Sequence, residues 1–400
     1  MSHPISLGRG ANASAMSRFL LGASLVLIAF NLRPVFSSAS TLLPEIRDTL
    51  GLSGLGASIL TTLPVLCLGL FSPLAPRMSQ WIGTERTLLA AVLLLACGTA
   101  LRGLPSVPLL FLGTALAGAC IAVSNVLLPG LVKRDFSDRA ALMTGWYTMA
   151  LCAGAAGAAG LTLPIKQSLG LPLGGALAVW ALPALLAGLL WLPQVLSRRS
   201  QGGQTRPAVQ SLWRNRPAWH ITLFMGLQSA LAYCVFGWLV PILRERGLDG
   251  VTAGAIVSMS VMMQAGACLV APHIAVRGRD QRAINVALSV LAVVALLGLL
   301  FAPLWSVWFW AALQGIGQGG LIAVALTVIV LRARDSHVAA QLSSMAQCVG
   351  YLLAAIGPLI VGLIHGWTGS FAWSAVLFIL LGAGTAINGW FAGRALHVEP

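Results

Sequence analysis

Twelve apolar stretches, each long enough to cross a lipid bilayer, dominate this sequence. A helix needs about 20 apolar residues to span a hydrocarbon core about 30 Å thick. With 58% apolar residues, 8% charged residues and a mean hydropathy of +0.89, the chain lies outside the composition of water-soluble domains. We therefore predict an all-α membrane protein with twelve transmembrane helices, at 19–42, 54–76, 86–104, 108–132, 139–164, 174–196, 218–240, 253–272, 284–303, 307–331, 338–364 and 373–392.

The basic residues indicate how these spans are oriented. Of the 24 Lys and Arg residues, eighteen flank the spans on one side and five on the other. Because Lys and Arg accumulate in cytoplasmic loops, this asymmetry places both termini in the cytoplasm. The net charge of +14 is also compatible with nucleic-acid binding, but the basic residues punctuate membrane spans and do not form a polar domain. We expect no nucleic-acid partner.

A polar segment and an internal repeat divide the spans into two groups of six. The pattern Pro-x-x-Arg-acid follows the first span at Pro44 to Asp48 and recurs after the seventh, at Pro241 to Glu245, with an offset of 197 residues. Two parallel repeats about an axis along the membrane normal are the plan of the major facilitator fold. We predict a cytoplasmic tail 1–18, six-helix halves 19–196 and 218–392 joined by a cytoplasmic loop 197–217, and a cytoplasmic tail 393–400.

Arg33 is the residue of fixed charge that lies deep within a predicted span. An arginine near the bilayer centre costs roughly 2.5 to 3.5 kcal/mol on insertion scales, so it must face water, a partner or both. Two structural roles are open: Arg33 can cap carbonyls freed by a kink at Pro34, or pair with Glu45. The functional alternative is that its planar guanidinium attracts a small anionic or polarised solute.

Other polar side chains share helix faces within the spans. Arg33 and Ser37 are four residues apart, whereas Asn31 points away from Arg33. The alternative for these residues is that amides and hydroxyls tie helices together, at about 0.6 kcal/mol each. The small-residue runs around Gly154 and Gly357 favour close helix packing and bending over ligand contact. With Arg33, the residues that we predict to shape a substrate pocket are Ser37, Asn125, Tyr147, Gln228, Tyr233, Gln264, Gln314, Gln318, Gln347 and Tyr351.

No pattern of catalysis or nucleotide binding is found. The sequence has no G-x-x-x-x-G-K-[ST] motif, so ATP is not the expected energy source. The seven cysteines fall within apolar spans without C-x-x-C spacing, and no cluster of His, Asp and Glu offers metal or acid–base chemistry. We predict no enzyme activity, no catalytic residue, no metal and no cofactor.

Several strings resemble the bacterial cyanate and 2-nitroimidazole permease family of major facilitator transporters. They are Asn31-Leu32-Arg33-Pro34, Leu42-Leu43-Pro44-Glu45-Ile46-Arg47, Leu60-Thr61-Thr62-Leu63-Pro64, the segment from Asn125 to Phe136, and Met345-Ala346-Gln347 with Gly350-Tyr351-Leu352. The resemblance extends over essentially the whole chain. It implies a monomeric multi-pass protein of the bacterial inner membrane.

The sequence and the resemblance together predict a secondary active or facilitative transporter that works by alternating access. Its solute is expected to be small and anionic or polar, either cyanate-like or 2-nitroimidazole-like. One alternative is a multidrug:proton antiporter, which usually needs a carboxylate embedded in a span. Another is a membrane solute sensor that does not transport. The lipid bilayer and the solute are the partners expected.

Overall fold

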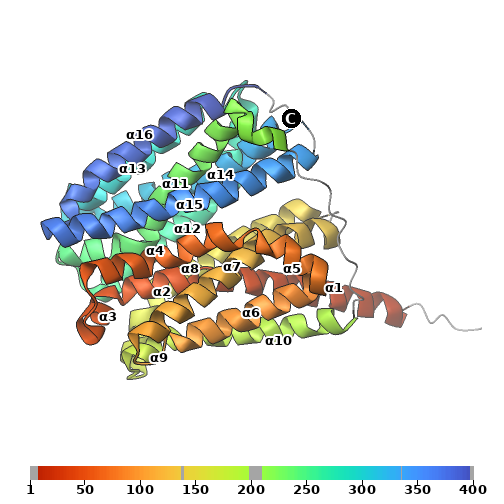
Figure 1. The fold of residues 1–400 in the computed structure, drawn as a ribbon, viewed down its shortest axis with the longest axis horizontal. Coiled ribbons are helices and arrows are strands. Elements are labelled where there is room, and N and C mark those ends of the chain that lie inside the picture. Colours follow the sequence, from red (N-terminus) through yellow and green to blue (C-terminus); the bar gives the residue numbers. More distant parts are fainter. Residues whose placement is uncertain (1–7, 137–138, 198–209, 335, 397–400) are drawn as a thin grey trace, which may run out of the picture.

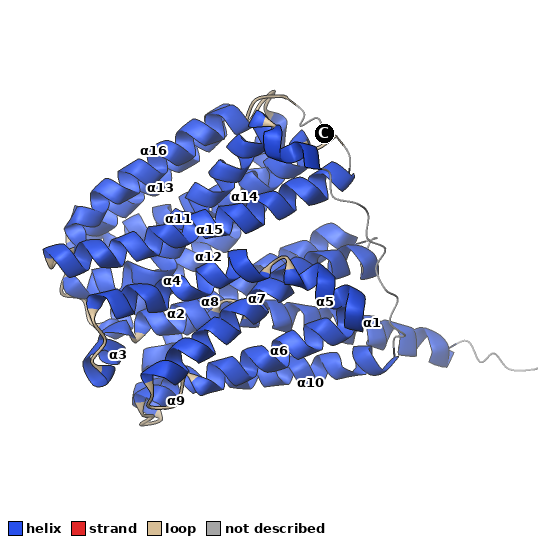
Figure 2. Cartoon of the chain, viewed as in Figure 1, coloured by secondary structure: helices blue, strands red, loops and turns tan. Residues whose placement is uncertain are grey.

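The chain folds into a bundle of long helices (Figures 1 and 2). The computed structural model describes residues 8–136, 139–197, 210–334 and 336–396, so parts of the predicted segments 1–18, 197–217 and 393–400 lie outside the described residues. The helices are α1 (Gly8–Asn31), α2 (Pro34–Thr41), α3 (Leu43–Leu50), α4 (Gly54–Phe71), α5 (Leu74–Ile82), α6 (Thr84–Leu101), α7 (Val107–Asp135), α8 (Ala140–Ser168), α9 (Leu173–Ala178), α10 (Ala181–Ser197), η2 (Gln210–Arg214), α11 (Arg216–Glu245), α12 (Gly250–Arg277), α13 (Arg282–Phe301), η3 (Leu304–Ser306), α14 (Val307–Arg332), α15 (Ser336–Thr368), η4 (Phe371–Trp373) and α16 (Ser374–Ala392).

The predicted number of spans is confirmed, because twelve helical segments of the described chain are long and apolar enough to cross a membrane. Two of the spans are built from two α-helices each: α1 with α2, and α9 with α10. The second span ends earlier than predicted, at Phe71, and a separate helix, α5, follows it. Pro73 lies at this boundary, where a proline favours the end of a helix because it has no N–H to donate.

The helices form two groups of six spans that pack against each other. Figure 1 shows α1–α10 in the lower part of the view and α11–α16 in the upper part. Across the boundary, α4 packs on α15, α8 packs on α12, and α2 contacts α11. Because α4 and α12 are the second spans of their halves, and α8 and α15 the fifth, the two main contacts are equivalent under the repeat. This is the predicted parallel two-repeat architecture.

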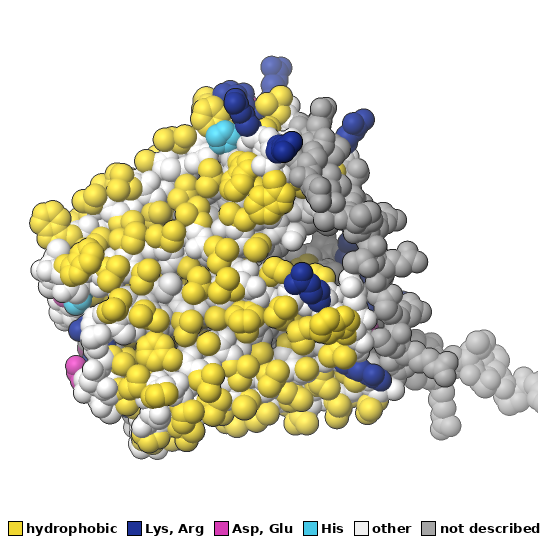
Figure 3. Space-filling model, in the orientation of Figure 1, with side chains coloured by type: hydrophobic (Ala, Val, Ile, Leu, Met, Phe, Trp, Pro, Cys, Tyr) yellow, Lys and Arg dark blue, Asp and Glu magenta, His cyan; other side chains and the backbone are white. Residues whose placement is uncertain are grey.

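The two ends of the bundle differ. We call the end at which α1 begins and α16 ends the terminal end, and the opposite end, where α3 and α9 lie, the distal end (Figure 1). Figure 3 shows apolar side chains over the flank of the bundle and the basic side chains of this face mainly toward the terminal end. Large apolar residues such as Leu189 and Val330 are 65% and 66% exposed, as expected of a surface that faces lipid.

Candidate functional site

Arg33 lies at a break in the first span, between α1 and α2. It is the N-cap of α2, and Pro34 occupies the first position of that helix. In a continuous helix the carbonyl of Phe30 would accept a hydrogen bond from the N–H of residue 34, and Pro34 has no N–H to donate. That carbonyl lies against Gly154 of α8, where a Cβ atom would be only 1.9 Å from the oxygen. The break therefore depends on a proline in one helix and a glycine in its neighbour.

The Arg33 side chain reaches across to the C-terminal half. Its Nη1 donates a hydrogen bond of 2.9 Å to the hydroxyl of Tyr233 on α11. The guanidinium carbon also lies 5.7 to 5.9 Å from the ring centres of Phe36, Tyr233 and Phe236, within range of cation–π attraction. Arg33 is half-buried, so one part of the residue is covered by protein and another part remains accessible.

All three tyrosines of the chain gather around this arginine. Tyr147 of α8 and Tyr351 of α15 are close enough to interact electrostatically with the guanidinium, and the rings of Tyr233 and Tyr351 meet edge to face at 6.1 Å. Tyr147 and Tyr351 are half-buried. The phenols come from both halves of the molecule, so the site lies between the halves.

Neither structural role considered for Arg33 is observed. Glu45 is engaged elsewhere, because both of its carboxylate oxygens accept from Arg244 at 2.9 Å. Within the described parts of the chain, Arg33 makes no ion pair and no hydrogen bond to a carbonyl, and its hydrogen bond is the one to Tyr233. The cation is thus anchored by a neutral group, and its charge is not compensated by a described carboxylate.

Most of the predicted glutamines connect helices or turns of the C-terminal half. Gln318 of α14 donates to the backbone and side-chain oxygens of Gln228 on α11, at 3.0 and 3.1 Å. Gln314 accepts a 2.6 Å bond from Ser260 of α12. Gln347 donates to Ser343, one turn earlier on α15. Gln228, Gln314 and Gln318 are at most 2% exposed, which is the geometry expected of helix–helix ties.

The remaining predicted residues have fewer contacts. Gln264 is buried on α12 where its backbone approaches Gly319 of α14. Ser37 is buried on α2, and its hydroxyl has no hydrogen-bond partner among the described residues. Asn125 of α7 is half-buried, and its amide nitrogen likewise lacks a partner in the described part of the chain. The Asn125 amide nitrogen is thus a buried donor without a described partner.

Three residues near Arg33 were missed by sequence reasoning. Phe36 and Phe236 supply two of its aromatic neighbours, and the thiol of buried Cys152 on α8 is close enough to interact with its charge. Phe36 lies three residues after Arg33 and is equivalent to Tyr233 at the repeat offset of 197, a signal that was available in the sequence. For Cys152 and Phe236, which lie within apolar spans, the sequence offers no comparable signal.

A pocket of about 830 Å³ opens toward the terminal end beside the first span. On α1 it reaches Val26, seven residues before Arg33, and on α8 it reaches Trp146, next to Tyr147. At 1.5 Å per residue, Val26 and Arg33 are about 10 Å apart along the chain. Figure 3 shows the surface hollowed between the two halves at this end. The residues that line this pocket all belong to the N-terminal half, and Arg33 and the three tyrosines are not among them.

The distal end is joined between the halves. The ion pair between Nη1 of Arg244 and both carboxylate oxygens of Glu45 links α11 to α3. Farther along the same boundary, α4 and α15 pack closely at glycines. A Cβ atom added to Gly54 of α4 would lie 3.4 Å from the Cα atom of Gly366 on α15, and a Cβ atom added to Gly362 would lie still closer to the side chain of Ser58. The two halves are thus held together at the distal end by an ion pair and by close backbone packing.

Comparisons with known proteins agree with this architecture. The Major Facilitator Superfamily family model matches residues 19–312. The chain is 40% identical over 388 residues to a 2-nitroimidazole transporter of Escherichia coli strain K12, covering 96% of this chain and 98% of the relative. It is 27% identical over 348 residues to a cyanate transport protein of the same organism, covering 87% and 90%.

The fold is also found among solved structures. A bacterial homolog of the human lysosomal transporter Spinster, in an inward-facing and unoccupied conformation, superimposes with a TM-score of 0.75 at 15% identity, covering 96% of this chain and 98% of that one. This likeness supports the fold, and the sequence relatives support the family. The chain therefore belongs to the Major Facilitator Superfamily and is a multi-pass membrane transporter.

Proposed function

We propose that this transporter carries a small, flat, anionic or strongly polarised solute that binds at Arg33. The observation that carries the proposal is a half-buried arginine that has no counter-ion among the described residues and whose guanidinium is anchored by a neutral phenol. A charge held in this way at membrane depth is stabilised further by any solute that brings negative charge. A solute with two oxygens on one atom, such as a carboxylate or a nitro group, can accept two parallel N–H hydrogen bonds from a guanidinium.

The aromatic surroundings favour a flat ring over a linear ion. Phe36, Tyr233 and Phe236 already lie around the guanidinium, and Tyr147 and Tyr351 add two half-buried phenols. Aromatic walls with a few convergent polar groups are typical of sites for small organic ligands. A nitroimidazole-like solute, with a planar ring and a nitro group, meets both requirements, and the 40% identical relative supports this class. A cyanate-like ion is the second candidate, supported by the 27% identical relative.

We assign Arg33, Tyr147, Tyr233, Tyr351 and Asn125 to solute contact. The other predicted residues, Ser37, Gln228, Gln264, Gln314, Gln318 and Gln347, are assigned to the walls and to the helix ties behind them. The six-helix halves 19–196 and 218–392 are proposed to rock about this site in alternating access. We place the protein as a monomer in the bacterial inner membrane with both termini cytoplasmic, and expect neither an enzymatic reaction nor a nucleic-acid partner.

The test is uptake of 2-nitroimidazole and cyanate by proteoliposomes containing the wild type, Arg33→Gln or Arg33→Lys. A charge-assisted hydrogen bond contributes roughly 1.5 to 3 kcal/mol, so Arg33→Gln should reduce transport at least tenfold. Arg33→Lys keeps the charge but loses the planar fork, and should retain part of the activity. Both variants should remain monodisperse in detergent. Undiminished uptake of both solutes by folded Arg33→Gln protein would remove Arg33 from the site.

A further inference from the structure

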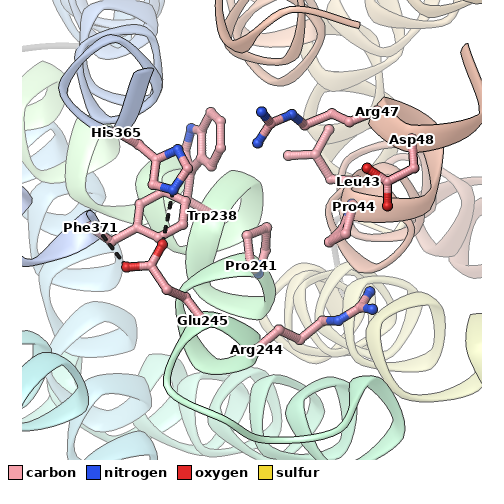
Figure 4. Close-up of a pocket in the computed structure, with 10 residues that line it drawn as sticks. All are labelled: Leu43, Pro44, Arg47, Asp48, Trp238, Pro241, Arg244, Glu245, His365 and Phe371. Carbon is pink, nitrogen blue, oxygen red and sulfur yellow. Dashed lines mark hydrogen bonds and ion pairs between the residues drawn. The ribbon is translucent and has the colours of Figure 1, made fainter. Parts of the chain in front are cut away.

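A second cavity lies at the distal end, away from Arg33. It has a volume of about 400 Å³, and both halves contribute to its walls. Figure 4 shows α3 on one side, with α11 and the end of α15 on the other. The residues around it are Leu43, Pro44, Arg47, Asp48, Trp238, Pro241, Arg244, Glu245, His365 and Phe371.

The internal repeat explains an asymmetry in the charges here. At the offset of 197 residues, Arg47 is equivalent to Arg244, and Glu45 is equivalent to Ile242. Arg244 pairs with Glu45 of the other half through two contacts of 2.9 Å. The symmetric counterpart of that ion pair would join Arg47 to residue 242. Because residue 242 is isoleucine, Arg47 is left without the carboxylate that its equivalent possesses.

The Arg47 guanidinium is directed into the cavity instead. Figure 4 shows it pointing toward the wall formed by Trp238 and His365, with no bond drawn to another of the lining residues. Its Nε is buried and has no hydrogen-bond partner among the described residues, and none of the ion pairs found there includes Arg47. A partly buried guanidinium with open donors is a favourable partner for an oxyanion.

The acidic groups of the cavity are occupied or directed elsewhere. Glu245 accepts from the backbone N–H of Phe371 at 3.0 Å and lies 2.9 Å from Nε2 of His365. Asp48 is exposed, and Figure 4 draws no ion pair between its carboxylate and the Arg47 guanidinium. Neither carboxylate therefore substitutes for the missing partner of Arg47.

The wall that faces Arg47 is aromatic. Trp238 is 2% exposed, and its indole N–H donates a hydrogen bond to the carbonyl of Pro358. The rings of His365 and Phe371 are stacked at 4.0 Å, and Phe371 also packs on Trp238 at 5.5 Å. An anion held by Arg47 would thus have the rings of Trp238, His365 and Phe371 opposite its charged group, which suits an aromatic body better than a hydrated inorganic ion.

We propose that this cavity is a second anion-binding site, which takes a small aromatic carboxylate in place of the carboxylate that Ile242 does not supply. The carboxylate would bind the Arg47 guanidinium, and its ring would lie against Trp238 and Phe371. Because the walls come from both halves, such a ligand binds only when the halves are joined at the distal end. It should therefore stabilise this conformation and slow transport. The proposal does not depend on the solute that binds at Arg33.

Benzoate is the probe, measured by thermal stability of the purified protein in detergent. A ligand that binds the folded state must raise its Tm in a saturable way. We expect benzoate to raise the Tm of the wild type, and neutral benzamide and the non-aromatic acetate to have little effect. An equal Tm shift with benzamide would refute the requirement for a negative charge. An equal Tm shift with acetate would refute the requirement for an aromatic ring.

Two arginine variants separate the distal site from the central one. In Arg47→Gln, the benzoate concentration needed for the same Tm shift should be roughly tenfold higher or more. Arg47→Lys should need a concentration between those of the wild type and Arg47→Gln. Arg33→Gln should leave the benzoate-induced Tm shift unchanged. Benzoate should also inhibit uptake by the wild type but not by Arg47→Gln. An equal benzoate effect in the wild type and Arg47→Gln would overturn the proposal. Loss of the effect in Arg33→Gln alone would place the ligand in the central site and overturn it as well.

Discussion

The first helices of the two halves occupy equivalent positions in the repeat but have different structures. In the N-terminal half, α1 and α2 are separated at Leu32 and Arg33, and the arginine lies at the break. In the C-terminal half, α11 continues without a break from Arg216 to Glu245, and nearly all of its residues from Thr222 to Leu243 are buried. At the repeat offset, Arg33 is equivalent to Ala230. The two halves thus share the position of this helix in the fold, but only the N-terminal copy carries the break and the arginine.

This difference shows how one charge can be held between two halves that move. The broken helix supplies the cation, and the continuous helix supplies the neutral hydroxyl that anchors it. The equivalent aromatic residues Phe36 and Tyr233 meet across the boundary with ring centres 5.4 Å apart. Because the anchor on α11 is a phenol and not a carboxylate, it positions the guanidinium without neutralising it.

The largest expected effect comes from removing the space that accommodates the break. Gly154→Ala places a methyl group 1.9 Å from the Phe30 oxygen, so α1 and α8 must separate. We expect a loss of stability of roughly 3 kcal/mol, with loss of transport. Gly157→Ala is the matched control, because its nearest neighbour would be 3.8 Å away. Thermal unfolding and uptake should distinguish the two variants, and equal behaviour would show that close packing at Phe30 does not maintain the break.

The next effect concerns the hydroxyl on the continuous helix. Tyr233→Phe removes the 2.9 Å hydrogen bond to Arg33 but keeps the ring. Since a hydrogen bond to a charged group contributes roughly 1.5 to 3 kcal/mol, KM for uptake should rise about tenfold or more. Combining this change with Phe36→Tyr moves a hydroxyl to the equivalent position in the other half. Partial recovery in the double variant would show that Arg33 requires a nearby phenol from either helix.

A smaller effect is expected at the distal end, where α3 meets α11. Glu45→Gln removes the ion pair to Arg244, whose partners are both partly exposed, so about 1 kcal/mol should be lost from the joined state. The variant should show a lower Tm and faster labelling of distal cysteines introduced between the halves. The charge reversal Glu45→Arg with Arg244→Glu should restore both values. If it did not, the contact would not join the halves through its charges.

The smallest effect is expected behind the site. Gln318→Leu removes the two hydrogen bonds to Gln228 on α11, and membrane amide ties average about 0.6 kcal/mol. We expect a slight decrease in Tm and uptake within about twofold of the wild type. A loss of transport as large as that of Arg33→Gln would instead place Gln318 in contact with the solute.

The sequence was informative about where elements and polar groups lie along the chain. The twelve spans, the two-repeat plan and the spatial grouping of Arg33 with all three tyrosines could be predicted, because hydrocarbon excludes polar backbone and makes each embedded charge costly. The interruption of the first span was foreseen only as a kink. Its full separation into α1 and α2 depends on Gly154, which lies on another helix and more than a hundred residues away.

The partners of the polar residues were decided by tertiary structure alone. Spacing grouped Gln228, Gln314 and Gln318 with the pocket, whereas packing ties Gln228 to Gln318 and Gln314 to Ser260. The same holds for Glu45, which could have joined Arg33 and instead binds Arg244. Apolar content determines that a segment enters the membrane, and this property is local to the segment. The rotation and crossing of each helix determine which side chains meet, and these depend on the surfaces of all its neighbours.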